Sequence, residues 1–222
     1  MKHDNSKNDD FLVNPVLEEY SLLHTSEEHD LLHDLDRQTH IKVLMPRMIS
    51  GHLQGSFLAM LIKMAKPHRI LELGTFTGYA TLCMAMAMPD DCVITTLEKS
   101  PELACMAGEY FEKSGLGNRI HQQIGDAKEN VPLLNEMYDF VFIDADKKNN
   151  RFYYETLLPK VNTGGFILVD NVLWDGKVVP SDAPEDKDTV AIRDFNDFVQ
   201  ADKRVKNLLL PFRDGIMIMQ KI

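Results

Sequence analysis

The chain of 222 residues is long enough to bury a substantial core in one compact domain, and its hydrophobic fraction of 44% is that of an ordinary globular protein. Its 24 Lys and Arg against 34 Asp and Glu give a formal net charge of -10, which argues against a nucleic-acid partner because phosphates need a basic surface. The polar beginning lacks a signal-peptide core, no stretch resembles a membrane helix, and the three cysteines show no C-x-x-C spacing. We therefore expect a cytoplasmic protein with reduced thiols and no membrane partner.

The first 65 residues are expected to form helices after a disordered tail over residues 1–10. Thr25 is predicted to cap a helix, because Glu27 and Glu28 follow it in a first turn that favours acids. The predicted helices span residues 15–24, 25–40 and 51–65, the last with apolar side chains along one face.

From Lys66 onward, short apolar runs alternate with helical stretches. Strands are predicted over residues 69–73, 92–97, 119–124, 138–143 and 166–169, with helices through Met88, from Pro101, and over 127–137, 151–158 and 188–198. Gly164 and Gly165 are expected to lead into the fifth strand. Two last strands, 205–211 and 216–220, are joined by a short turn containing Gly215, which predicts an antiparallel hairpin. The fold class is therefore α/β, with a seven-stranded, mostly parallel sheet, helices on both faces and a C-terminal hairpin.

Acidic residues stand at the carboxyl ends of the predicted parallel strands, where doubly wound sheets bind their ligands. These acids are Glu72, Glu98, Asp126, Asp144 and Asp170.

The turn after the first strand carries two glycines, Gly74 and Gly78, which allow a ligand to approach the backbone. Their G-x-x-x-G spacing is not the dinucleotide fingerprint, and Glu72 would repel a pyrophosphate. Glu72 instead suits a ligand with an ammonium group, such as the methionine end of S-adenosylmethionine. The alternative is a plain strand-to-helix turn without a ligand.

Two further acids fit a nucleoside. Glu98 is placed to accept hydrogen bonds from ribose hydroxyls, a feature that NAD and S-adenosylmethionine share. Asp126 is placed to meet an adenine amino group. Glu98 could instead be a solvated acid at a strand end.

Asp144, Asp170 and Asn171 end two neighbouring strands and offer two carboxylates and an amide oxygen, a hard site for Mg²⁺, Mn²⁺ or Ca²⁺. Alternatively, the acids cap helices or pair with the nearby lysines. Lys147 is placed either to act as a general base or to orient a hydroxyl group, and a surface ion pair is its alternative role. Trp174 is a candidate wall of an acceptor pocket or a core residue.

These residues lie in a sequence that resembles the cation-dependent O-methyltransferases of the caffeoyl-CoA and catechol type, especially their small bacterial members. The resemblance rests on the stretches ILELGTFTGYATL, GDA, YDFVFIDADK and GGFILVDNVLWDGKV, and on RMISGHLQGSFLAML and FRDGIMIMQKI at either side. It covers nearly the whole chain after about residue 40, and the segment before that matches poorly.

The resemblance implies a Rossmann-like methyltransferase fold in a single domain over 1–222, with helices over 11–65 covering the active site and a cofactor-binding core over 66–222. It implies that Asp144, Asp170 and Asn171 hold the metal and that Asp214 lies near the substrate. Lys147 is the expected catalytic residue and Trp174 an expected substrate contact, both from their positions near the predicted metal ligands. It places the S-adenosylmethionine site at Ile49, Glu72, Gly74, Thr75, Ala80, Glu98, Asp126, Ala127 and Asp144. Ala80 stands where many relatives have serine. A homodimer is also expected.

The reaction thus expected is metal-dependent transfer of a methyl group from S-adenosylmethionine to a catechol-like phenol. A non-catalytic S-adenosylmethionine-binding module is one alternative, and a nicotinamide-dependent oxidoreductase is another. The sequence leaves the phenol, the ring position, the metal and acceptance of a CoA ester open.

Overall fold

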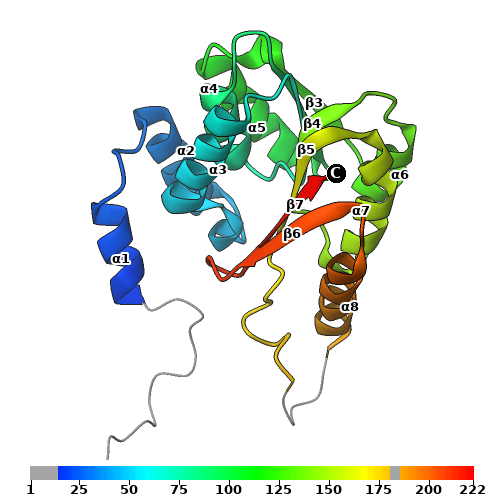
Figure 1. Ribbon diagram of the computed structural model, residues 1–222. Coiled ribbons are helices and arrows are strands. Elements are labelled where there is room, and N and C mark those ends of the chain that lie inside the picture. Colours follow the sequence, from blue (N-terminus) through cyan, green and yellow to red (C-terminus); the bar gives the residue numbers. More distant parts are fainter. Residues whose placement is uncertain (1–14, 181–185) are drawn as a thin grey trace, which may run out of the picture.

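The computed structural model describes residues 15–180 and 186–222, which build one seven-stranded sheet with helices around it (Figure 1). The expected tail over 1–10 lies outside the described residues. The strands are β1 (Arg69–Leu73), β2 (Val93–Glu98), β3 (Ile120–Ile124), β4 (Tyr138–Ile143), β5 (Val161–Asp170), β6 (Val205–Leu210) and β7 (Ile216–Lys221).

The sheet has the strand order β3-β2-β1-β4-β5-β7-β6. The first five strands run parallel, whereas β7 runs antiparallel to both β5 and β6. From β1 the chain moves outward through β2 and β3 and then returns to place β4 on the other side of β1. This reversal is the switch point of a doubly wound sheet, where a crevice opens at the carboxyl ends. The predicted fold class is therefore confirmed.

Helices cover both faces of the sheet (Figure 1). They are α1 (Pro15–Leu23), α2 (Asp30–Lys42), α3 (Gly51–Ala65), α4 (Tyr79–Ala87), α5 (Pro101–Lys113), α6 (Ala127–Asn130), α7 (Asn150–Leu157) and α8 (Lys187–Ala201). No helix in the described ranges is both long and apolar enough to cross a membrane.

The sheet is buried on both faces. Along β4, Phe140 and Phe142 join the apolar cluster of α2 to α5, while Val141 and Ile143 join the cluster of α7 and α8. This alternation follows from the two-residue period of a strand buried on both faces.

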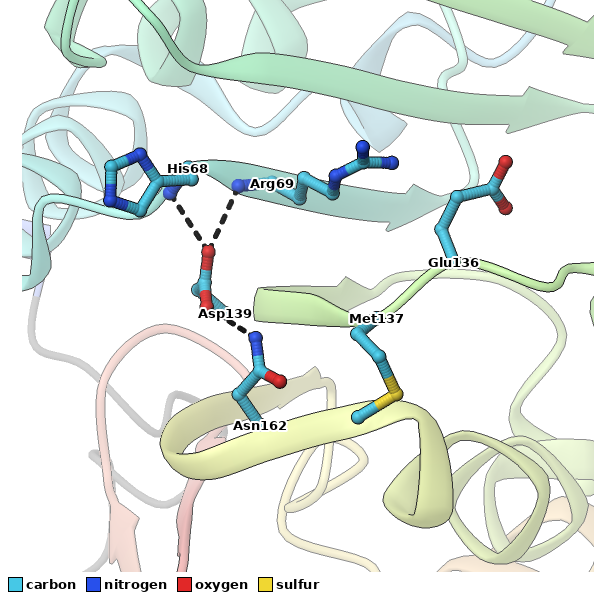
Figure 2. A pocket seen from close by; sticks show the side chains of 6 residues that line it. All are labelled: His68, Arg69, Glu136, Met137, Asp139 and Asn162. Carbon is cyan, nitrogen blue, oxygen red and sulfur yellow. Dashed lines mark hydrogen bonds between the residues drawn. The ribbon is translucent and has the colours of Figure 1, made fainter.

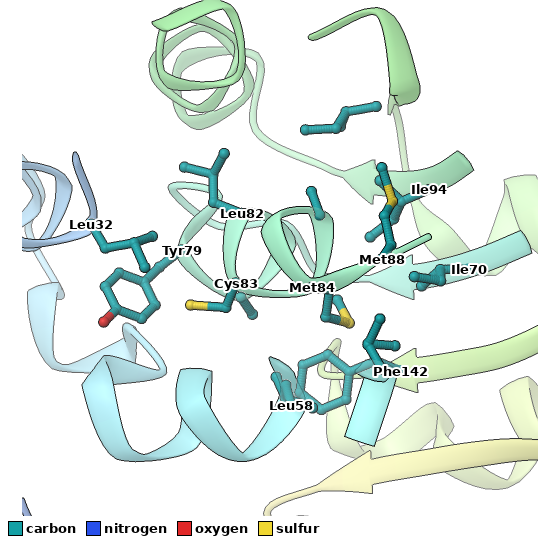
Figure 3. Close-up of a cluster of buried hydrophobic side chains, with 14 of the residues drawn as sticks. Leu32, Leu58, Ile70, Tyr79, Leu82, Cys83, Met84, Met88, Ile94 and Phe142 are labelled. Atoms are coloured by element: carbon teal, nitrogen blue, oxygen red, sulfur yellow. The ribbon is translucent and has the colours of Figure 1, made fainter. Parts of the chain in front are cut away.

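The packing of α3 on α4 brings the N-terminal helices against the core (Figure 3). A Cβ atom at Gly55 would lie 2.5 Å from the Cys83 sulfur and 2.8 Å from the Tyr79 ring, so only glycine permits this approach. Leu58, one turn further along α3, is fully buried in the same cluster. This close contact fixes the position of α3 relative to α4 and to the sheet beneath it.

The second helix begins later than predicted. α2 starts at Asp30 with His29 as its N-cap, and not at Thr25. The Thr25 hydroxyl donates to a carbonyl group near the end of α1, and Glu28 accepts a hydrogen bond from the Tyr79 hydroxyl. The predicted start was wrong because these polar side chains serve the preceding helix and a tertiary contact instead of a new helix end.

Two other boundaries also differ. The helix predicted over 127–137 was too long, because α6 ends at Asn130 and a 3-10 turn follows, with Pro132 lacking the N–H that a continuing helix needs. β5 starts at Val161, so the glycine pair beginning at Gly164 lies inside the strand and not before it. The pairing of β5 with β4 shifts register at this point, which accommodates the extra residues.

Candidate functional site

A cavity of about 1410 Å³ opens at the carboxyl ends of the central strands, and the segment 42–54 forms another part of its wall. Most of the predicted site residues line it, namely Gly74, Glu98, Asp126, Ala127, Asp144, Lys147, Asp170, Asn171, Trp174 and Asp214. Ile49, Glu72, Thr75 and Ala80 are buried and are not part of this lining, so their contact with a cofactor stays a prediction.

Glu72 lies one residue before the end of β1 and is fully buried. Its Oε2 accepts hydrogen bonds from the hydroxyl groups of Thr96, at 2.6 Å, and Thr81, whereas its Oε1 has no partner among the described residues. Burial raises the pKa of Glu72 from 4.5 to about 8. A buried carboxyl with one free oxygen fits an ammonium group, which would satisfy that oxygen and stabilise its charge.

The backbone geometry at position 74 requires glycine. Its φ is +96°, and a Cβ atom there would lie 2.1 Å from the carbonyl oxygen of Asp144. The backbone N–H of Asp144 donates to the Leu73 carbonyl at 2.8 Å. The glycine turn and the end of β4 are therefore packed together, so the turn also positions Asp144.

Glu98 and Asp126 differ in how they are held. Each Glu98 oxygen accepts one backbone N–H, Oε2 from Phe76 at 2.7 Å and Oε1 from Ser100 at 2.9 Å, which leaves lone pairs for ribose hydroxyl groups. Asp126 caps α6 through its Oδ1 and pairs with Lys99 through its Oδ2 at 2.8 Å. The Lys99 hydrogen bond lowers the pKa of Asp126. Both acids line the cavity, and Asp126 in addition caps α6, a role that was not predicted for it.

Asp144, Asp170 and Asn171 lie together in the cavity. Burial and then repulsion by Asp144 raise the pKa of Asp170, which is only 5% exposed. Within the ranges that the structure describes, no group of three His, Cys, Asp or Glu side chains is placed to hold a metal ion. A cation site here therefore depends on two carboxylates and the Asn171 amide, as the sequence predicts. Such an oxygen set fits a hard divalent cation that keeps some of its water.

Lys147 lies beside these acids. Its Nζ donates to Asp144 Oδ1 at 2.6 Å, and its side chain is only 13% exposed, so the pair is not a solvated surface contact. Asp146 accepts hydrogen bonds from Tyr153 and Asn149 and thereby stabilises the start of α7. Of the acids near Lys147 in sequence, Asp144 is thus the one that it contacts.

Trp174 and Asp214 come from two loops that lie together. Trp174 packs against the cluster of α7 and α8 and also lines the cavity, and its contact with an acceptor stays a prediction. Asp214 accepts hydrogen bonds from the Asn171 amide at 3.2 Å and from the backbone N–H of Asp175. Asp214 therefore holds the loop that carries Asn171, and its contact with a substrate stays a prediction.

Gln54 and Arg213 also line the cavity and were not predicted. Gln54 is 1% exposed and donates to Asp170 Oδ2 at 2.7 Å. It shares the buried face of α3 with Leu58 and Ile62. A polar residue on the apolar face of a predicted helix was the available signal for Gln54.

A second, smaller cavity of about 460 Å³ lies at the opposite end of the strands (Figure 2). Asp139 is its most connected residue, accepting hydrogen bonds from the backbone N–H groups of His68 and Arg69 and from the Asn162 amide. These bonds tie together the starts of β1, β4 and β5, which is a structural role.

A crevice at the switch point that is lined by Glu98, with Glu72 buried nearby and one of its oxygens unpartnered among the described residues, suits an S-adenosylmethionine-dependent enzyme better than a dinucleotide enzyme. The comparisons agree. A family model described as O-methyltransferase matches residues 22–222. A caffeoyl-CoA O-methyltransferase of Petunia hybrida is 39% identical over 183 residues, which is 76% of this chain and 74% of that protein.

Solved structures give the same result. The SAH-bound methyltransferase PaMTH1 of Podospora anserina superposes with a TM-score of 0.87 at 28% identity, covering 94% of each chain. An O-methyltransferase from Bacillus cereus in complex with SAH gives 0.84 at 29% identity, covering 93% of this chain and 97% of that one. The chain therefore belongs to the O-methyltransferase family, and it is an S-adenosylmethionine-dependent enzyme of the caffeoyl-CoA O-methyltransferase type.

Proposed function

We propose that the enzyme methylates one hydroxyl group of a vicinal-dihydroxy, catechol-like phenol and needs a divalent cation to do so. The observation that carries this proposal is the meeting of Asp144, Asp170 and Asn171 in the cavity that also contains Glu98. One carboxylate of the pair, Asp170, lies almost fully buried beside the other. Two such acids are most stable together with a cation between them.

We assign one group of residues to the cation and another group to the cofactor. Asp144, Asp170 and Asn171 would hold the cation, while Glu72 and Glu98 would hold the ammonium and ribose ends of the cofactor. A cation bound there supplies Lewis-acid activation and a template for two adjacent hydroxyl groups. The cofactor supplies a reactive methyl group on a sulfonium, so the main task of the protein is to align the acceptor oxygen with it.

Lys147 is the residue placed to handle the acceptor proton. Its Nζ lies 2.6 Å from Asp144 Oδ1, at the edge of the proposed cation site. In the neutral form Lys147 would take the proton as the acceptor oxygen forms its new bond to carbon, and in the charged form it would orient that hydroxyl group.

The acceptor would lie against Trp174. Lys42, Arg47 and Lys148 are exposed and line the same cavity, and none of them forms an ion pair with another described residue. These three cations would favour an acceptor with an anionic group, and the exposed acids Glu102 and Glu109 line the cavity as well. Several relatives are caffeoyl-CoA O-methyltransferases, so we propose a catechol acid or its CoA ester as the acceptor class.

Charge-removing variants test the cation site. We expect Asp144→Asn and Asp170→Asn each to lower turnover by about 100-fold or more, while the affinity of Asp170→Asn for S-adenosylhomocysteine, measured by calorimetry, changes little. Asp91→Asn is the matched control, because this acid is 66% exposed and precedes β2 at the opposite end of the sheet. Full turnover in both site variants would contradict the proposed role of the acids.

We further propose that the enzyme is a homodimer. α1 has no buried residue, and Leu17, Tyr20 and Leu23 are each at least 60% exposed. A nine-residue helix is too short to be stable alone, so a second chain packed on it would explain its formation. Light scattering is expected to give a dimer mass for the wild type and a monomer mass for Leu17→Ser combined with Leu23→Ser. A monomeric wild type would refute this.

A further inference from the structure

The side chain of Gln54 has both ends of its amide fixed. Its Nε2 donates to Asp170 Oδ2 at 2.7 Å, and its Oε1 accepts a hydrogen bond from the Arg213 guanidinium. Arginine only donates and the carboxylate only accepts, so the amide can satisfy both partners in this one orientation. Gln54 is buried, and water cannot easily replace either partner.

Arg213, which holds the Gln54 amide oxygen, lies in the turn between β6 and β7. Its guanidinium also donates to the carbonyl group of Ser50, immediately before α3. The turn and the start of α3 are thus joined through one guanidinium, although the residues are 163 positions apart. The position of Gln54 relative to β5 is therefore set by two elements and not by α3 alone.

Asp214, the next residue, fixes the second ligand. Its Oδ2 accepts from the Asn171 amide nitrogen at 3.2 Å, and its backbone carbonyl accepts from the Leu173 N–H at 2.9 Å. Because a carboxylate accepts and does not donate, the amide nitrogen of Asn171 must face Asp214. The amide oxygen is then left without a partner among the described residues, and it is the atom that a cation would use.

We propose that Gln54 and Asp214 are positioning residues that orient Asp170 and Asn171 for the divalent cation. This inference rests on the proposed metal dependence. A ligand that is already held in its binding rotamer loses less freedom when the cation binds. Neither residue needs to touch the cation or the acceptor to have this effect.

The test measures cation affinity directly, with Mn²⁺ as the probe and electron paramagnetic resonance of the free ion as the readout. Gln54→Met keeps length and removes the donor, and Asp214→Ala removes the acceptor. We expect each to raise the Kd for Mn²⁺ by about 10- to 100-fold, with the Kd for S-adenosylhomocysteine unchanged within about twofold. Asp214→Asn keeps one acceptor oxygen and should lose less affinity than Asp214→Ala.

Ser56→Ala is the matched control on α3, since Ser56 does not line the cavity and the hydroxyl's one hydrogen bond to a described residue is with His52, at 3.5 Å. Excess Mn²⁺ is expected to restore turnover in the Gln54 and Asp214 variants, which a general packing defect would not allow. An unchanged Kd for Mn²⁺ in both variants, while Asp170→Asn abolishes binding, would overturn the inference alone. Loss of turnover that excess metal cannot restore would also overturn it. A wild type that binds no Mn²⁺ would remove the proposed metal dependence, and this inference with it.

Discussion

Replacement of Glu72 by glutamine keeps the shape of a buried side chain and removes its ability to ionise. Burial raises the pKa of Glu72 from 4.5 to about 8 in the folded protein. Between these two pH values the unfolded chain holds fewer protons at this position than the folded chain does. The free energy of unfolding of the wild type therefore falls as pH rises from about 4.5 to about 8. Glu72→Gln has no titrating group at this position, so its free energy of unfolding does not fall for this reason.

The size of the effect follows from the same shift. At roughly 1.4 kcal/mol per pH unit, the difference accumulated between pH 4.5 and pH 7 is about 3 kcal/mol. For a chain of 222 residues this corresponds to a Tm about 6–12 °C higher for Glu72→Gln at pH 7. At pH 5 the two proteins should melt within about 3 °C of each other.

The assay is thermal unfolding of cofactor-free protein at several pH values between 5 and 8, followed by calorimetry with S-adenosylhomocysteine. We expect Glu72→Gln to be more stable than the wild type and to bind the cofactor product at least about tenfold more weakly, since a charge-assisted hydrogen bond is lost. Glu155→Gln, an exposed acid paired with Arg151, is the control and should show no such pH-dependent gain. A Tm difference that does not vary with pH would refute the reasoning on Glu72.

Three further predictions concern other parts of the chain. Gly74→Ala places a Cβ 2.1 Å from the Asp144 carbonyl oxygen, so we expect a lower Tm together with loss of turnover, and a variant of normal stability and activity would contradict the packing. Leu58→Ala leaves a cavity in a fully buried position and is expected to cost about 3 kcal/mol in urea unfolding, whereas a loss below about 1 kcal/mol would contradict this packing. The Arg204 hydrogen bond holds the pKa of Asp202 below its usual range, so this pair stabilises the fold above about pH 4 and less below it. Asp202→Asn should lower stability by about 1–2 kcal/mol at pH 7, with the gap closing in acid, and a gap independent of pH would count against the pair.

The sheet and one edge of the site could be predicted because local signals determine them. Apolar runs alternating with helices indicate parallel strands, and parallel strands bring their carboxyl ends to one edge. Asp144 and Asp170 could therefore be placed together without any knowledge of tertiary contacts, and the structure confirms that both line one cavity. The hairpin could be predicted in the same way, from two apolar runs and the turn containing Gly215.

Other features depend on contacts between distant segments, which leave no local period in the sequence. Gln54 meets Asp170 across 116 positions and Arg213 across 159, so neither could be assigned to the site from spacing. The predicted start of α2 was wrong for a related reason. Glu28 accepts a hydrogen bond from Tyr79 of α4 and does not lie in the first turn of a helix. Propensity describes what a segment favours alone, and tertiary hydrogen bonds override it.

The central claim is metal-dependent methylation of a vicinal diol. The most direct measurement is mass-spectrometric detection of methylated product from S-adenosylmethionine with caffeoyl-CoA, caffeic acid and a monohydroxy analogue, each with EDTA and after addition of Mg²⁺. We expect methylated product from the two diols and none from the monohydroxy analogue. We expect EDTA to abolish formation of this product and Mg²⁺ to restore it. Undiminished methylation in EDTA, or equal methylation of the monohydroxy analogue, would contradict the account.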